Sequence, residues 1–275
     1  MQDNFRSFSG IALNQDYPQA RILFGQLAKE IYEEVQRRFG KYELLRDRWS
    51  DAYSKTREYI DRLHYPILEK STAFFLAAVN QILRQRKTGL RTATQADLEK
   101  ALRIKYFREE LLLHNITTSL VLRKGEESFD KESNKFMEIY LTKQLRERSR
   151  DIKFPVVIPL SSLELEEDTN SPYEGLAFKL NDDAEFVHAP IFNEEDNNFF
   201  SEDIDEKTGI PVRLRKEGNR YFNTGGYDYG LAELSVSSMG GSSDIEGFSI
   251  NSYNCAFMYN PLHKGWNSRV LLVKP

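Results

Sequence analysis

The charge of this sequence and its chain-breaking residues both change at about residue 150. Residues 1–150 hold 28 Lys and Arg against 21 Asp and Glu, whereas residues 151–275 hold 10 against 21. The same boundary separates 5 Gly and 2 Pro from 10 Gly and 7 Pro. Because glycine and proline interrupt helices and mark turns between strands, the basic first part favours helices and the acidic second part favours strands.

Apolar residues at helical spacing predict the elements of the first part. The expected helices span about 18–39, 45–63, 74–83, 94–112 and 129–149. The segment 74–83 is apolar on more than one side, which is typical of a central helix. Thr94 and Asp97 have the spacing of a capping box at a helix start. The β-branched segment 116–123 favours a first strand.

Short β-forming runs separated by turn residues predict the second part. The expected strands are 154–160, 176–180, 185–192, 199–204, 210–215, 229–236, 248–259 and 268–274. Two prolines in 154–160 indicate an edge strand or an extended arm, and residues 206–209 are typical of a hairpin turn. Residues 223–227 and 237–243 are expected to be flexible loops.

These patterns predict an α+β fold. An N-terminal bundle of about four helices would occupy the basic part, 1–150, and a mainly antiparallel, β-rich region would occupy the acidic part, 151–275. The two parts form either separate domains or one continuous fold, since 275 residues suit both arrangements.

Bulk composition indicates a soluble protein made in the cytoplasm. The single cysteine, Cys255, allows no internal disulfide. No apolar run approaches the roughly 20 residues of a membrane span, and no signal peptide is recognisable. The chain holds 18 Phe and 14 Tyr. Such aromatic residues either fill a sheet core or cover interfaces with partners.

Two basic runs close predicted helices. They contain Arg84, Arg86, Lys87 and Arg91, and then Arg146, Arg148 and Arg150, with Lys143 nearby. Cations at helix C-termini stabilise the helix dipole, which is a sufficient reason for their position. Binding of phosphates is the functional alternative. Because acids lie nearby and the whole chain has a net charge of −4, nucleic acid is a partner that we do not favour.

An acidic run lies in the second part. It contains Glu194, Glu195, Asp196, Glu202, Asp203 and Asp205. Its spacing does not match the calcium loop with its central glycine, so a solvated loop is the first interpretation. A second interpretation is that this acidic part docks on the basic part of a neighbouring copy. Trp266, in a turn near the end of the chain, is another candidate contact residue.

Catalytic motifs and cofactor motifs are not recognisable. His64, His114, His188 and His263 show no zinc spacing. Cys255 lies inside an expected strand, which favours a buried structural role over nucleophilic catalysis. Paired glycines at 225–226 and 240–241 lack the lysine of a phosphate-binding loop. We therefore predict no cofactor, no metal site and no catalytic residue.

Two classes of function remain open. The first is a non-catalytic structural or adaptor protein that forms a homo-oligomer, binds other subunits and becomes part of a particle, by analogy a phage neck, connector or tail component. The second is a hydrolase or nucleic-acid-processing enzyme with an unmarked carboxylate site around residues 164–168 or 194–206. The polarised charge and the many aromatic residues favour the first class.

Overall fold

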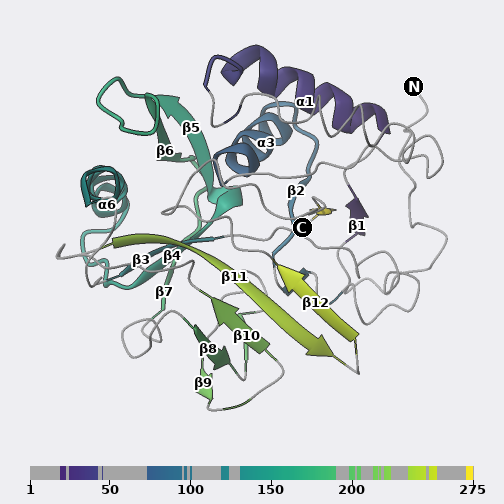
Figure 1. Cartoon of the computed structure of the whole chain (residues 1–275), viewed down its shortest axis with the longest axis vertical. Coiled ribbons are helices and arrows are strands. Elements are labelled where there is room, and N and C mark those ends of the chain that lie inside the picture. The colour runs from purple at the N-terminus through teal and green to yellow at the C-terminus, as the bar shows by residue number, and fades with distance from the viewer. Residues whose placement is uncertain are drawn as a thin grey trace.

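The computed structural model places many strands among few helices (Figure 1). It describes residues 19–22, 25–42, 45, 73–94, 96–97, 100, 119–123, 131–189, 198–201, 203–205, 213–215, 217, 220–223, 235–245, 248–252 and 271–274. The helices are α1 (Gly25–Phe39), α3 (Ala73–Gln85), α6 (Lys131–Arg148) and the 3-10 helix η1 (Leu160–Ser162).

The described strands form three antiparallel sheets. A three-stranded sheet has the order β1 (Gln19–Ile22), β13 (Leu271–Lys274) and β2 (Arg91–Thr92). A two-stranded sheet pairs β5 (Leu163–Glu167) with β6 (Leu176–Leu180). The largest sheet contains β7 (Val187–His188), β4 (Val156–Pro159), β3 (Ser119–Arg123), β11 (Ser235–Ile245), β10 (Arg220–Asn223), β8 (Asn198–Ser201) and β9 (Leu214–Arg215), with β12 (Phe248–Ser252) paired to β11.

Helix α3 lies at the centre of the core. Every residue from Ala73 to Leu83 is buried, as expected for a helix that is apolar on more than one side. Phe74 stacks on Phe178 of β6 with ring centroids 4.5 Å apart. Helix α1 packs against α3 on one side, and β5 and η1 contact α3 on another. The confirmed helix 74–83 therefore organises most of the described core.

Two buried polar side chains of α3 bind neighbouring strands. The Asn80 side chain accepts a hydrogen bond from the backbone N–H of Thr92 (2.9 Å) and donates one to its hydroxyl (2.8 Å). On another side of α3, Gln81 bonds the backbone of Leu165 in β5. Each contact satisfies polar groups that would otherwise be buried without partners.

The predicted N-terminal bundle of about four helices is wrong. In the described part of residues 1–150, the element order is β1, α1, α3, β2, β3 and α6, so three strands are interspersed among three helices. These strands pair with strands from the second part: β1 and β2 flank β13, and β3 lies between β4 and β11. Helix α6 contacts β6 and β11. An apolar stripe predicts that a helix face is buried, but it does not say whether a helix or a sheet covers it.

Several boundaries also differ from the prediction. Helix α1 begins at Gly25, because Gln19–Ile22 pairs as a strand with β13. Residues 237–243, expected to be a loop, lie inside β11. Strand β4 is not an edge strand, since β3 and β7 flank it. In each case pairing between distant segments overrides the local preference of the chain. The predicted helices 45–63 and 94–112 lie almost wholly outside the described residues.

Other predictions are confirmed. Strand β6 spans Leu176–Leu180 as expected, and α6 occupies most of 129–149. Strands β8 and β9 pair antiparallel, whereas the expected hairpin turn at 206–209 lies outside the described residues. No helix in the described residues has both the length and the apolar character required to cross a membrane.

Candidate functional site

Helix α6 has a firmly held inner face. Met137, Leu141 and Leu145 recur every four residues and are fully buried. The Gln144 side chain donates a hydrogen bond to the carbonyl of Phe178 (3.2 Å) and accepts one from the N–H of Leu180 (2.8 Å). Apolar packing and these bonds to β6 therefore fix the rotation of α6 about its own axis.

The last turn of α6 is held by Arg148. Its guanidinium donates hydrogen bonds to the carbonyls of Asn181 and Asp182, each at 2.9 Å, and lies 4.0 Å from the Asp182 carboxylate. Arg148 was predicted as an interaction residue. In the structure Arg148 forms contacts within its own chain, where it joins α6 to the turn after β6.

The outer face of α6 carries the candidate site. We call Ile139, Lys143, Arg146 and Arg150 the α6 stripe. Ile139, Lys143 and Arg146 are spaced by four and three residues, which places them on one side of α6. Arg150 lies two residues after the end of the helix and continues this spacing. All four side chains are exposed, and Ile139 is 54% exposed. None of the three cations forms an ion pair with a described residue.

The basic run at the end of α3 is arranged differently. Three of its arginines form ion pairs inside the chain: Arg84 with Glu164, Arg86 with Glu30 (3.0 Å) and Arg91 with Asp97 (2.6 Å). Lys87 is exposed and has no ion pair among the described residues. Most of the predicted α3 patch is therefore already engaged by carboxylates of the same chain.

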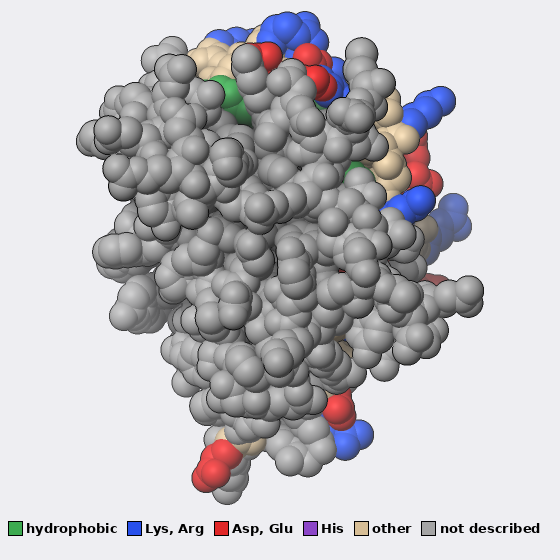
Figure 2. All heavy atoms as spheres, turned by 90° about the vertical axis from the view of Figure 1, so that its right-hand side faces the viewer, with side chains coloured by type: hydrophobic (Ala, Val, Ile, Leu, Met, Phe, Trp, Pro, Cys, Tyr) green, Lys and Arg blue, Asp and Glu red, His purple; other side chains and the backbone are tan. Residues whose placement is uncertain are grey.

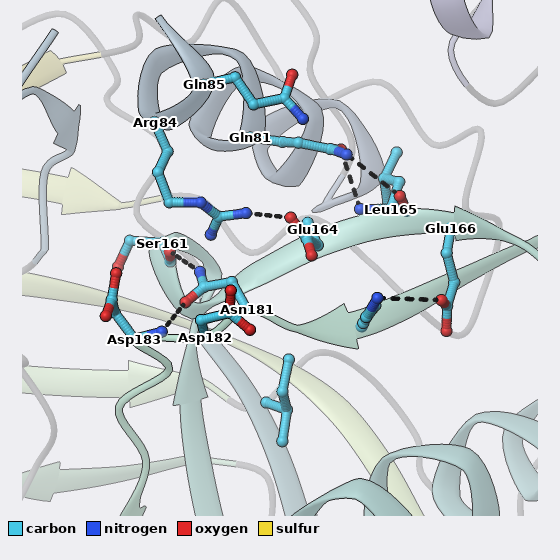
Figure 3. Close-up of polar contacts among 12 residues, drawn as sticks. Gln81, Arg84, Gln85, Ser161, Glu164, Leu165, Glu166, Asn181, Asp182 and Asp183 are labelled. Carbon is cyan, nitrogen blue, oxygen red and sulfur yellow. Dashed lines mark hydrogen bonds and ion pairs between the residues drawn. The ribbon is translucent and has the colours of Figure 1, made fainter. Parts of the chain in front are cut away.

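Figure 3 shows how α3 meets the β5–β6 hairpin. Arg84 extends from α3 to Glu164 on β5. Beside it, the Gln81 amide spans the backbone of Leu165, accepting a bond from its N–H (3.1 Å) and donating one to its carbonyl (3.4 Å). Gln81 thus bonds the backbone of Leu165 at the β5 edge, and Gln144 bonds the backbone of Phe178 and Leu180 at the β6 edge.

The carboxylates around 164–168 do not converge. Glu164 faces Arg84, Glu166 accepts a hydrogen bond from the Tyr140 hydroxyl, and Glu167 pairs with Lys41 (2.9 Å). Asp168 accepts hydrogen bonds from the backbone and side chain of Asn170. These separate partners give the carboxylates structural roles, and none of these contacts favours a shared catalytic centre.

Two of these contacts change the titration of the groups involved. Burial, followed by the hydrogen bond to Glu166, raises the pKa of Tyr140 well above its ordinary value. The hydrogen bond from Lys41 lowers the pKa of Glu167, and the same bond raises the pKa of Lys41. Tyr140 therefore remains a protonated hydrogen-bond donor, and Glu167 and Lys41 remain ionised, across the physiological range.

The acidic run is only partly described. Asp203 is exposed and Asp205 is half-buried, whereas Glu194, Glu195, Asp196 and Glu202 lie outside the described residues, as does Trp266. His188 is exposed, and its Nδ1 lies 2.9 Å from the carbonyl of Lys153. Cys255 and the other three histidines are also outside. Within the described ranges, no three His, Cys, Asp or Glu side chains are grouped so that they could hold a metal ion.

Ile139 is the residue of the candidate site that sequence reasoning missed. The helical pattern in 129–149 was traced through Phe136, Met137, Tyr140, Leu141 and Leu145. Ile139 lies about 200° around a helix from Met137, on the side opposite the buried stripe. The sequence therefore contained a signal for an exposed contact residue, because Ile139 is an isoleucine on the polar side of the predicted helix.

Opposite charges are mixed on the surface. On the face in Figure 2, the described Lys and Arg side chains lie next to Asp and Glu side chains at the top and along one edge. Across the residue-150 boundary, the described ion pairs are Arg84 with Glu164, Lys41 with Glu167 and Arg148 with Asp182. Part of the charge that is separated in the sequence is therefore neutralised inside the folded chain.

No protein-family model, curated protein or solved structure is detectably similar to this chain.

Proposed function

We propose that this protein is a non-catalytic structural or adaptor component of a multi-subunit assembly, and that it binds its partners through the α6 stripe. The observation that carries the proposal is the contrast between two basic helix ends. At the end of α3 the arginines are paired within the chain. On α6, Lys143, Arg146 and Arg150 point outward beside an exposed isoleucine.

A purely structural role explains the stripe less well. Singly exposed apolar residues are common and need no explanation by themselves. Cations in the last turn of a helix offset its dipole, which accounts for Arg146, but Lys143 lies more than one turn before the end of α6 at Arg148. Lys143, Arg146 and Arg150 lie in register with Ile139, so the surface contains one exposed apolar side chain with cations beside it. Such a surface suits a protein partner, because apolar burial supplies affinity and the charges supply orientation and association rate.

The narrower prediction of a phage neck, connector or tail component rests on analogy. It remains a prediction, together with synthesis in the cytoplasm and incorporation into a particle. Around 164–168 the alternative of a carboxylate enzyme has no specific contact in its favour, since those carboxylates have separate partners. Its other predicted position, 194–206, lies only partly within the described residues.

Sedimentation velocity of the full chain tests the proposal. We expect species larger than the monomer at low ionic strength, and their loss in the variant Lys143→Glu/Arg146→Glu with an unchanged circular dichroism spectrum. The matched control is Lys153→Glu/Lys274→Glu, which makes the same charge change at exposed lysines outside the stripe. A wild-type chain that stays monomeric at low ionic strength would contradict the proposal.

A further inference from the structure

We infer that the α6 stripe binds the acidic segment 194–206 of a second copy, so that copies join head to tail. This inference rests on the proposed function and adds the identity of the partner. The segment holds seven acidic residues and no Lys, Arg or His: Glu194, Glu195, Asp196, Glu202, Asp203, Asp205 and Glu206. Its charge is therefore opposite to that of Lys143, Arg146 and Arg150.

The composition of the segment also suits the apolar end of the stripe. Residues 194–206 include two adjacent phenylalanines, Phe199 and Phe200, between their acidic groups. The stripe likewise combines an apolar residue with charge, but of the opposite sign, since Ile139 is followed by cations along one helix face. Aromatic residues combined with opposite charge provide both components of a protein interface, a desolvated contact and complementary charge around it.

The two surfaces lie on different parts of the molecule. In Figure 1, α6 is at the left flank, whereas β8, which lies within the acidic segment, is at the lower end beside β9. Figure 2 shows acidic side chains at that same lower end, with a basic side chain beside one of them. Asp203, two residues after the end of β8, is exposed and has no ion pair among the described residues. Complementary surfaces at separate places on one molecule favour contacts between copies.

Pairing of one α6 stripe with another is electrostatically unfavourable. A two-fold axis through the stripe would bring Lys143 and Arg146 of one copy against the same cations of the next, and facing like charges destabilise an interface. A contact between α6 and the acidic segment is instead heterologous. Heterologous contacts close into a ring if the rotation per copy divides a full turn, and otherwise continue as a filament.

Reciprocal charge reversal tests the inference. The stripe variant is Lys143→Glu/Arg146→Glu/Arg150→Glu, and the segment variant is Glu195→Lys/Asp196→Lys/Asp203→Lys. We expect each variant alone to lose the larger species seen by native mass spectrometry. In an equal mixture, each variant keeps the surface that the other lacks, so we expect species containing both chains to form. Circular dichroism and thermal unfolding establish that both variants fold.

Separate outcomes identify which idea fails. If the stripe variant loses assembly but the segment variant keeps it, the stripe binds another surface, so the inference is wrong and the proposed function stands. A mixture without species containing both chains also overturns the inference. If the wild-type chain is monomeric at low ionic strength, the proposed function itself is wrong. Assembly that persists unchanged in both variants would contradict a role for either surface.

Discussion

The C-terminal ends of α3 and α6 look alike in the sequence but differ in the folded chain. Both carry several cations within one or two turns. Around the end of α3, Arg84 and Arg86 bind carboxylates of β5 and α1. On α6, Arg148 binds carbonyls of the turn after β6, whereas the cations of the α6 stripe have no such contact with a described residue and face solvent. A basic run therefore indicates an interaction surface only where the fold has not already supplied its partners.

The comparison also separates two uses of opposite charge. Within the described chain, ion pairs across the residue-150 boundary join α3 and the loop after α1 to β5, and α6 to the turn after β6. Such exposed or partly exposed pairs contribute only modestly to stability, because water and salt screen them. The cations of the α6 stripe form no such pair with a described residue, and we propose that they orient a partner.

The largest effect is expected at the two glutamines that hold the hairpin. Gln81→Ala should lower the free energy of unfolding by about 2–3 kcal/mol, since it leaves the N–H and carbonyl of Leu165 buried without partners. Gln144→Ala should cost about 1 kcal/mol, because its site is partly open and water can replace the amide. Urea unfolding measures both changes.

Gln85→Ala is the control for the glutamine variants. Gln85 ends α3, is exposed, and accepts a hydrogen bond from Arg38, so its loss should change the free energy of unfolding by less than about 0.5 kcal/mol. If Gln81→Ala lowered the free energy of unfolding as little as Gln85→Ala, the hydrogen bonds from Gln81 to Leu165 would not stabilise the hairpin.

A second prediction separates stability from assembly. Arg84→Ala should lower the free energy of unfolding by about 1 kcal/mol or less, since the Arg84–Glu164 pair is partly exposed, and it should leave assembly intact. Arg146→Ala should change stability by less than about 0.5 kcal/mol but weaken assembly. Unfolding curves and sedimentation of both variants measure the two effects. The reverse result, with assembly sensitive to Arg84 alone, would assign the interface to α3.

Local signals predicted the parts of the fold that local interactions determine. The capping box is an example: the Thr94 N–H donates to the Asp97 carboxylate (2.7 Å), and the Asp97 N–H donates to the Thr94 hydroxyl (3.3 Å). Helices α3 and α6 were predicted for the same reason, because a buried stripe repeats within a few turns.

Distant pairing could not be predicted in this way. Gln19–Ile22 forms a strand because residues 271–274 lie beside it, and the Ser- and Gly-rich segment 237–243 forms a strand because β3, β10 and β12 pair with β11. For the candidate site, sequence reasoning found the cations. It did not determine that Arg84, Arg86 and Arg148 have partners inside the chain, since those partners are up to 80 residues away.

The end of α3 also allows a stabilising substitution. Lys87 has a φ of 52°, and the bonds from Lys87 N–H to Arg84 O and from Thr88 N–H to Leu83 O form a Schellman motif. A side chain is unfavourable in this left-handed conformation. Lys87→Gly should therefore raise the free energy of unfolding by about 0.5–1 kcal/mol, measured by urea unfolding, with assembly unchanged. Loss of assembly would place Lys87 in the interface.

The smallest effect concerns the basic end of α1, where Glu34 binds both Arg37 and Arg38. The hydrogen bond from Arg37, with a further bond from Arg38, lowers the pKa of Glu34 to about 2. The unfolded chain therefore takes up this proton first as the pH falls, so the contribution of Glu34 is present above about pH 4.5 and is lost towards pH 2. Comparing wild type with Glu34→Gln, we expect a stability difference of a few tenths of a kcal/mol at pH 6. That difference should shrink as the pH falls to 2, and also in 1 M salt. If urea unfolding gives the same difference at every pH in this range, the charge of Glu34 does not contribute to its contacts with Arg37 and Arg38.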